Sequence, residues 1–182
     1  MLEEIIIAGF GGQGVMSMGQ LIAYAGMIEG KGVSWLPSYG PEQRGGTANC
    51  AVVISDEPVG SPLVTSPTTA IVLNNPSFDK FEPRIRPGGL LIINSSMVVR
   101  LSERTDIKII EINATDLAND LGNSRVANII LLGSFLEYTK IVSIDSIVES
   151  LKKVLGADKH HLIDINKLAL EKGASLVQFQ MK

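Results

Sequence analysis

A β-branched run, a glycine-rich turn and an amphipathic helix follow one another at the start of this chain and constrain its fold most. Residues 4–8 contain Ile5-Ile6-Ile7, an apolar run that suits a strand buried on both faces of a parallel sheet. Residues 9–14 then satisfy the spacing G-x-G-x-x-G. Up to Ile28, apolar residues recur at intervals of three and four, as on one face of a helix. This order predicts a strand–loop–helix unit of the kind that builds parallel sheets.

The rest of the chain continues the alternation of strands and helices. We expect further strands at 33–36, 47–55, 70–73, 89–94 and 107–112, and helices at 77–84, 114–121, 125–138, 144–155 and 161–172. This order predicts a three-layer α/β/α, Rossmann-like fold with a mainly parallel sheet, in a single domain over residues 1–182. Residues 47–55 follow a loop rather than a helix, so they can pair antiparallel and make the sheet mixed.

A second glycine-rich segment, residues 37–46, follows the strand expected at 33–36. It has neither helical nor strand periodicity, and a loop of this length is costly to order unless it has a function. Arg44 can offer a fork of donors to a phosphate or carboxylate, and Glu42 can pair with Arg44. The alternative is a solvated surface loop that binds nothing. Both glycine-rich loops follow carboxyl ends of strands, the edge where open α/β sheets bind ligands, and this favours function.

Candidate cofactor-binding residues come from these two loops. In dinucleotide-binding folds the first glycine makes a tight turn, the second lets the backbone approach a pyrophosphate, and the third packs helix against strand. An equally weighted alternative is that the glycines only permit close packing. No carboxylate for a ribose ends the expected second strand, and we expect Gln13 to be an exposed polar group. The candidates are Gly9, Gly11, Gly12, Gln13, Gly14, Ser38, Tyr39, Glu42, Arg44, Gly45 and Gly46.

Composition excludes several classes of protein. The 182 residues include one cysteine, Cys50, and two histidines, too few for an iron–sulfur cluster or a structural zinc site. We find no metal ligands and no catalytic set. The net charge of −3 argues against nucleic acid as a partner, and the longest apolar run, residues 126–136, is too short to span a bilayer. The amino terminus lacks the basic region of a secretory signal, so we expect a cytoplasmic protein that does not contact a membrane.

Residues 9–14 and 37–46 together resemble the gamma subunit of 2-oxoacid:ferredoxin oxidoreductases, of the 2-oxoglutarate or branched-chain type. The likeness continues through residues 47–55, 87–89 and 128–133 and so covers nearly the whole chain. It implies a subunit of an enzyme that decarboxylates a 2-oxoacid, makes an acyl-CoA and reduces ferredoxin. Within this resemblance we favour 2-oxoglutarate as the substrate.

The resemblance also implies a division of labour. Thiamine diphosphate and the iron–sulfur clusters belong to alpha, beta and ferredoxin-like delta subunits, and this chain binds no cofactor alone. The chain is expected to help shape the approach of CoA, with Gln13, Tyr39, Glu42 and Arg44 facing the thiamine-binding subunits. Two other interpretations remain open. The chain can be a stand-alone nucleotide-binding regulatory module, or a purely structural assembly subunit.

Overall fold

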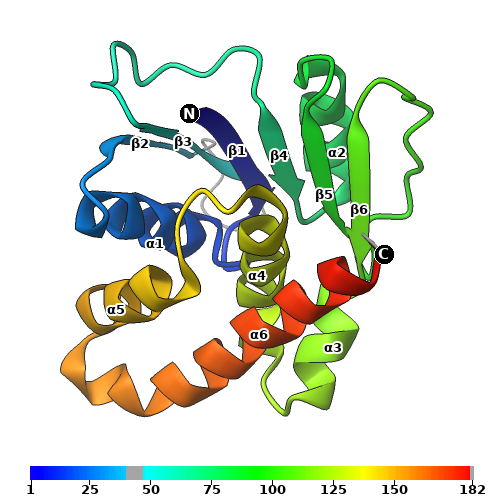
Figure 1. Cartoon of the computed structure of the whole chain (residues 1–182). Coiled ribbons are helices and arrows are strands. Elements are labelled where there is room, and N and C mark those ends of the chain that lie inside the picture. Colours follow the sequence, from blue (N-terminus) through cyan, green and yellow to red (C-terminus); the bar gives the residue numbers. More distant parts are fainter. Residues whose placement is uncertain (40–46, 181–182) are drawn as a thin grey trace.

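The computed structural model describes residues 1–39 and 47–180. Within them, six strands form one sheet in the order β2-β3-β1-β4-β5-β6 (Figure 1). The strands are β1 (Leu2–Phe10), β2 (Gly32–Tyr39), β3 (Thr47–Ser55), β4 (Thr69–Val72), β5 (Leu90–Asn94) and β6 (Lys108–Ile112).

The strand β3 makes the sheet mixed. Strands β1, β4, β5 and β6 pair in parallel, whereas β3 pairs antiparallel with both β1 and β2. Only residues 40–46 join β2 to β3, fewer than the dozen or so residues that a parallel crossover needs. The prediction of an antiparallel strand at residues 47–55 is therefore confirmed. The strand β2 runs in the same direction as β1, because both are antiparallel to β3.

Six helices cover the two faces of the sheet within the described residues. Helices α1, α4, α5 and α6 lie on one face and α2 lies on the other, while α3 packs beside α4 (Figure 1). The predicted three-layer α/β/α fold is confirmed. The helices are α1 (Val15–Ile28), α2 (Asn75–Phe81), α3 (Ala114–Asp120), α4 (Ala127–Thr139), α5 (Ile144–Val154) and α6 (Ile163–Gln180).

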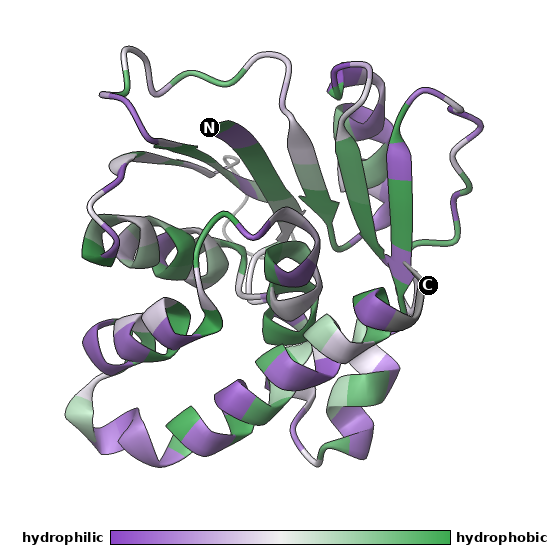
Figure 2. Cartoon of the chain, in the orientation of Figure 1, coloured by the Kyte–Doolittle hydropathy of each residue, from purple (hydrophilic) through white to green (hydrophobic). Residues whose placement is uncertain are grey.

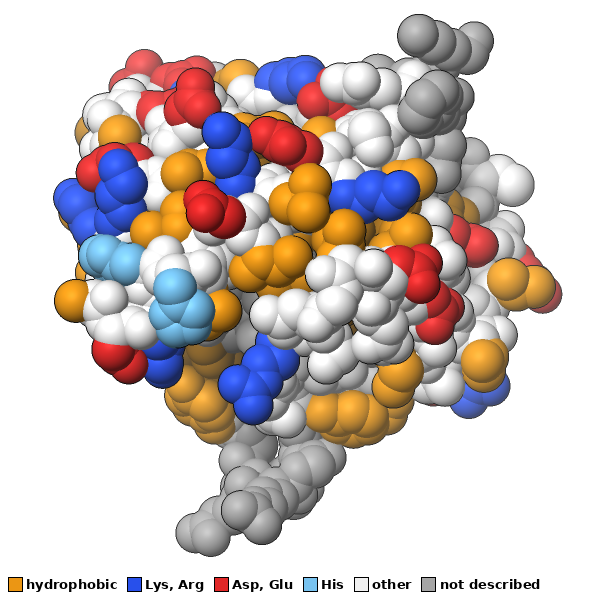
Figure 3. Space-filling model, turned by 90° about the horizontal axis from the view of Figure 1, so that it is seen from below, with side chains coloured by type: hydrophobic (Ala, Val, Ile, Leu, Met, Phe, Trp, Pro, Cys, Tyr) orange, Lys and Arg blue, Asp and Glu red, His pale blue; other side chains and the backbone are white. Residues whose placement is uncertain are grey.

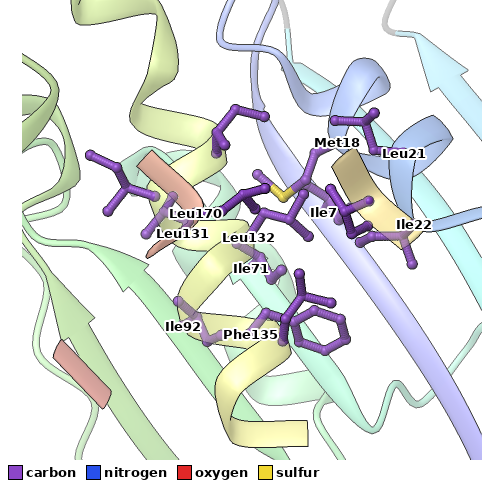
Figure 4. Close-up of a cluster of buried hydrophobic side chains, with 14 of the residues drawn as sticks. Ile7, Met18, Leu21, Ile22, Ile71, Ile92, Leu131, Leu132, Phe135 and Leu170 are labelled. Carbon is purple, nitrogen blue, oxygen red and sulfur yellow. The ribbon is translucent and has the colours of Figure 1, made fainter. Parts of the chain in front are cut away.

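The main hydrophobic core lies between the sheet and the larger helical layer. In Figure 4, Ile7, Ile71 and Ile92 from three neighbouring strands meet Leu132 and Phe135 of α4. The middle of α4 is buried on all sides, from residue 128 to residue 136. A helix in that position needs apolar residues around its whole circumference. Figure 2 shows the contrast, because the strands and α4 are largely green whereas α5 and α6 carry many purple residues.

The second strand is longer than the sequence indicates. We expected it to end at residue 36 because Pro37 follows, but β2 continues through Pro37 and Ser38 to Tyr39. Proline has no N–H to donate to a neighbouring strand, so it is confined to positions such as edge strands. The strand β2 is such an edge, since it pairs with β3 alone among the described strands. Ser38 and Tyr39 are therefore strand residues, not loop residues.

The last helix is also longer than expected. We placed its end at Lys172 because Gly173 follows, but α6 continues to Gln180. Gly173 lies where α6 crosses α4, and a Cβ there would collide with the carbonyl oxygen of Ile130. Gly133 of α4 meets the carbonyl of Leu170 in the same way. The two glycines therefore mark a close helix crossing rather than a helix end.

We expect Gly173→Ala to destabilise the protein, because the added methyl group must separate two backbones. Overpacking of this kind costs about 1–3 kcal/mol, although Gly→Ala inside a free helix usually stabilises it by about 1 kcal/mol. Chemical denaturation of the variant measures the change. Gly60→Ala is the control, since a Cβ at Gly60 meets nothing within 4 Å. Equal stability of the two variants would contradict the close crossing.

Candidate functional site

The candidate site lies at the carboxyl ends of β1, β4 and β5. From β1 the chain proceeds through α1 to the β2 side of the sheet, whereas β4 lies on the opposite side of β1 (Figure 1). Open α/β sheets bind ligands in the crevice where the strand order reverses in this way. Residues 9 and 10 end β1, and residues 11–14 lead directly from it into that crevice. The fold thus places the first glycine-rich loop at the usual position of a ligand site.

The glycines of this loop have different structural roles from those expected in a dinucleotide-binding loop. Gly9 lies within β1, and a Cβ there would stand 2.6 Å from Gln13 Oε1 and 3.1 Å from Leu73 Cβ. Gly12 and Gly14 have positive φ angles of 92° and 76°, which glycine adopts without strain. Gly11 has an open surrounding with no atom within 4 Å of a Cβ. The turn therefore depends on Gly12 and Gly14, close packing depends on Gly9, and Gly11 leaves room beside the backbone.

Gln13 ties the loop to the neighbouring strand. Its Oε1 accepts hydrogen bonds from the Phe10 N–H at 2.6 Å and from Asn74 Nδ2 at 3.5 Å. Its Nε2 donates to the Leu73 carbonyl at 3.4 Å. The expectation that Gln13 is exposed is wrong, because the side chain is half-buried between the ends of β1 and β4. Gln13 holds the loop in place rather than projecting into solvent.

Asn128, near the start of α4, fixes the other side of the loop. Its Nδ2 donates to the Gly14 carbonyl at 3.1 Å, and a Cβ on Gly14 would collide with that same nitrogen. Gly14 was expected to pack a helix against a strand, but its closest neighbour is this side chain of α4. The first turn of α1 is thereby joined to α4. The amino end of α1, where backbone N–H groups attract anions, lies beside this contact.

A cavity of about 270 Å³ opens next to the loop. Gly12 and Gln13 line it on one side, and residues of β5, α3 and α4 line the other. A second cavity of about 330 Å³ lies beyond Asn128, and Arg125 and Asn128 line both. Figure 3 shows the molecule from below, where the two histidines lie among both basic and acidic side chains. The first cavity is lined by Gly12, Gln13, Leu73, Asn94, Met97, Thr115, Ser124, Arg125, Ala127 and Asn128.

Two buried asparagines that line this cavity each keep an unsatisfied oxygen. Among the described residues, the Oδ1 atoms of Asn94 and Asn128 have no hydrogen-bond partner. The residues are 1% and 6% exposed. A buried polar atom without a partner costs about 1–3 kcal/mol, so such atoms in a native fold ask for an explanation. Sequence reasoning did not select these residues, although each is a polar residue within or directly after a buried apolar run.

The second glycine-rich segment begins at the same edge as the first. Phe10 pairs with Thr47 and Tyr39 pairs with Ala48, so the ends of β1 and β2 lie side by side across β3. Tyr39 is 71% exposed there, and Ser38 is also exposed. The expectation of a shared edge is confirmed for the residues that the structure describes. Glu42, Arg44, Gly45 and Gly46 lie outside the described residues.

Cys50, His160 and His161 could offer sulfur or nitrogen ligands to a metal, but they are not among the residues that line this cavity. Cys50 is fully buried, and burial raises the pKa of its thiol to about 12, with a smaller opposite effect from the Trp35 side chain. His160 and His161 contact the backbone carbonyls of Lys152 and Asp158. In residues 1–39 and 47–180, no three His, Cys, Asp or Glu side chains gather as a metal site would require. No helix in this part of the chain is long and apolar enough to cross a membrane.

We expect Gly14→Ala to lower the free energy of unfolding by about 1–3 kcal/mol, because the methyl group meets Asn128 and the positive φ becomes strained. Gly11→Ala is the matched control in the same loop. It should leave stability within about 0.5 kcal/mol, since its Cβ points into open space. Denaturant unfolding of both variants checks this. Equal losses in the two variants would count against the assigned glycine roles.

We expect the Cys50 thiol to resist alkylation at pH 8 in the folded protein and to react once the protein is unfolded. Burial disfavours the thiolate, which is the reactive form. The pKa of the thiol is about 12 in the folded protein and 9.0 ordinarily, so folding favours the protonated thiol. The stability that comes from keeping Cys50 protonated is complete below pH 9.0 and is lost as the pH rises towards 12. Mass spectrometry follows the labelling without interference, since Cys50 is the one cysteine of the chain. Rapid labelling of the native protein would show that the Cys50 thiol is not buried.

Comparison with known proteins places this geometry in a family. Residues 4–176 match the Pyruvate ferredoxin/flavodoxin oxidoreductase family. Ketoisovalerate oxidoreductase subunit VorA of Methanothermobacter marburgensis is 42% identical over 176 residues, covering 94% of this chain and 36% of VorA. The chain thus spans about a third of the length of this relative. The 2-oxoglutarate synthase subunit KorC of Methanocaldococcus jannaschii is 33% identical over 174 residues, which are 92% of each chain.

A solved structure shares the fold. The 2-oxoglutarate:ferredoxin oxidoreductase of Magnetococcus marinus, determined with 2-oxoglutarate, coenzyme A and succinyl-CoA bound, superposes with a TM-score of 0.88 at 23% identity. The superposition covers 97% of this chain and 31% of that one. The fold of this chain therefore recurs as part of a larger polypeptide. On the family match and the relatives together, the chain belongs to the pyruvate ferredoxin/flavodoxin oxidoreductase family.

Proposed function

We propose that this chain is the gamma subunit of a complex that oxidises a 2-oxoacid with ferredoxin as electron acceptor. The reaction joins the acyl group to CoA, releases CO₂ and a proton, and passes the electron pair to ferredoxin. The observation that carries the proposal is the extent of the family match, because residues 4–176 include β1 from its third residue and all of the other five strands that the structure describes. The nearly end-to-end match to KorC supports a separate subunit of this length.

Other subunits supply the redox chemistry in this proposal. An iron–sulfur cluster needs about four thiolates, whereas this chain has one cysteine, and that cysteine is buried. In this proposal, as the family resemblance implies, thiamine diphosphate and the clusters belong to alpha, beta and ferredoxin-like delta subunits. This chain contributes an α/β domain. It affects the reaction through the shape and charge of the surface that contacts the other subunits.

We place the carboxyl edge of the sheet at the junction with the thiamine-binding subunits. Three features of that edge support the placement. Tyr39 projects from the end of β2, Arg125 is exposed beside the cavity, and Gly11 leaves the loop backbone accessible. An arginine and a glycine-rich loop at a helix amino end suit the phosphates of CoA. Tyr39, Glu42 and Arg44 remain proposed junction residues, and Gln13 acts by holding the loop.

For the substrate we propose 2-oxoglutarate, with a branched-chain 2-oxoacid as the competing possibility. The support for 2-oxoglutarate is that KorC matches this chain along 92% of its own length, whereas VorA is nearly three times as long as the matched region. The higher identity to VorA favours ketoisovalerate instead. Both compounds therefore belong in the assay.

Purification of the tagged full chain from the cells that produce it tests the function. We expect thiamine-containing subunits to co-purify and the recovered complex to reduce a viologen dye only when CoA and a 2-oxoacid are both present. 2-Oxoglutarate and ketoisovalerate are compared at equal concentrations. Recovery of the chain alone, with micromolar binding of NAD or FAD, would instead support the stand-alone nucleotide-binding module.

In the recovered complex, we expect Arg125→Ala to raise the KM for CoA by about tenfold with little change in kcat, because a charge-assisted contact to phosphate is worth about 1.5–3 kcal/mol. Arg100→Ala is the matched control, since Arg100 is an exposed arginine that pairs with Asp79, and neither residue is among those that line the cavity. Steady-state kinetics at varied CoA concentration measure both variants. An unchanged KM in the Arg125 variant would remove Arg125 from the CoA path.

A further inference from the structure

The elements α1 and β2 lie together at one side of the molecule and contain no charged residue (Figure 1). Asp, Glu, Lys and Arg are absent from residues 5–28 and 32–39 of the sequence. On α1, Tyr24, Met27 and Ile28 are nevertheless 39%, 62% and 41% exposed. The cores of protein interfaces are enriched in tyrosine and methionine and depleted of charged residues. We call this surface of α1 and β2 the uncharged side, and its composition is that of an interface.

The two charged residues between α1 and β2 are each bound within the chain. Glu29 Oε1 accepts a hydrogen bond from the Ser143 N–H at 2.7 Å, and Lys31 Nζ donates to Asp56 Oδ1 at 2.8 Å. Like charges that face each other across an interface cost free energy. Because α1 and β2 carry none, two copies of the uncharged side can meet without this cost.

A groove of about 280 Å³ lies between α1 and β2 on the uncharged side. Two glycines of α1 bring the helix close to the strand. A Cβ at Gly19 would stand 2.8 Å from Trp35 Nε1, and one at Gly26 would stand 2.8 Å from Val33 Cγ2. Since the described lining has no charge, the groove suits apolar side chains from another molecule. It is lined by Gln20, Ala23, Tyr24, Met27, Val33 and Trp35.

Backbone hydrogen bonds determine which residues of β2 face outward. The Asp56 N–H donates to the Met1 carbonyl, so these two residues form a hydrogen-bonded pair of the ladder between β1 and β3. Such pairs alternate along an antiparallel ladder, and the pair of Ile7 and Cys50 is an even number of steps away. The backbone of Cys50 therefore bonds to β1. Pro37, opposite Cys50 on the other side of β3, accordingly directs its backbone groups away from β3.

The outward residues of β2 form an open strand edge beside the groove. By the same alternation, Val33, Trp35 and Tyr39 also direct their backbone groups away from β3, and β2 has no second neighbour among the described strands. An open edge of this kind is a template for another strand. Pro37 has no N–H, so it limits pairing to the part of β2 that precedes it. Val33 and Trp35 remain, and both also line the groove.

We propose that the uncharged side binds a second copy of this chain, through antiparallel pairing of β2 with β2 of that copy. Such pairing has a twofold axis perpendicular to the sheet, so both α1 helices lie on the same face and meet across the axis. The register that pairs most residues without Pro37 sets Val33 opposite Trp35 of the second copy. Ser34 then lies on the axis. The two sheets join into one continuous sheet.

The size of the uncharged side suits a dimer. The strand β2 has eight residues, so it is about 26 Å long. With α1 layered on the strand, this side of the molecule is about 20 Å deep. Its projected area is about 500 Å², and side chains make the accessible area larger, which approaches the roughly 800 Å² per partner of a standard interface.

Sedimentation equilibrium of the full chain tests the dimer. We expect the wild-type chain to be dimeric, and Met27→Glu to raise the dissociation constant at least about a hundredfold, because each dimer would bury two unpaired carboxylates. Leu168→Glu is the matched control. Leu168 is an apolar residue of α6 that is 47% exposed and does not line the groove, so its variant should remain dimeric. A wild-type chain that stays monomeric at its highest soluble concentration overturns the proposal, as does an unchanged dimer in Met27→Glu.

Cross-linking through engineered cysteines tests the strand register. In the proposed dimer Ser34 faces Ser34 of the second copy as a non-hydrogen-bonded pair, whose Cα atoms lie about 4.5 Å apart, close enough for a disulfide. We expect Ser34→Cys to form a disulfide-linked dimer under mild oxidation. Ser38→Cys is the matched control on the same face of β2, because the two copies of residue 38 are about 26 Å apart along the strands. Equal cross-linking of the two variants, or none in Ser34→Cys, refutes the pairing of β2.

The test of the dimer is independent of the test of the complex. A chain that dimerises through β2 but recovers no thiamine-containing subunits removes the proposed function and leaves the dimer standing. A complex that assembles and turns over, built on a chain that is monomeric alone, removes the dimer and leaves the proposed function standing. Wild-type background is low in the cross-linking experiment, because the one native cysteine, Cys50, is buried.

Discussion

The close crossing of α4 and α6 is the constraint on which the rest of the site depends. Gly133 and Gly173 let the two backbones meet, and the Ser134 hydroxyl donates to the carbonyls of Ile130 and Gly173 at 3.2 and 3.0 Å. With α6 outside it, α4 can lie against the sheet and be buried on all sides. Its first turn then stands over the glycine-rich loop, where Asn128 reaches Gly14. Stability of the core and geometry of the site are thus set by one helix.

The loop after β1 is held from two directions. Gln13 ties it to the end of β4 and Asn128 ties it to α4, so its glycines adopt one conformation without help from a ligand. A loop fixed in advance loses little freedom when a partner or a nucleotide binds, which raises affinity. The unsatisfied oxygens of Asn94 and Asn128 lie at this pre-formed edge.

The comparison of sequence and structure is most instructive at the glycines and the polar residues. The antiparallel β3 followed from the missing helix before residue 47, and its bounds were predicted correctly. Gly173 was taken as a helix end, because a sequence cannot show which helix a glycine will touch. Gln13 was taken as exposed, because its three partners come from β1 and the end of β4. Asn94 and Asn128 were not among the predicted site residues, because a sequence does not show which buried asparagines lie beside the same cavity.

The amino-acid order alone specified the alternation of strands and helices, the position of the first glycine-rich loop and the family, because these depend on local periodicity and on contiguous motifs. It also set the limit of one thiol for the whole chain. Tertiary structure decided which polar groups converge, since Gly14, Asn94 and Asn128 come from three distant segments. It decided which asparagine oxygens stay unpaired as well, because hydrogen bonding is a property of neighbours in space and not of neighbours in the chain.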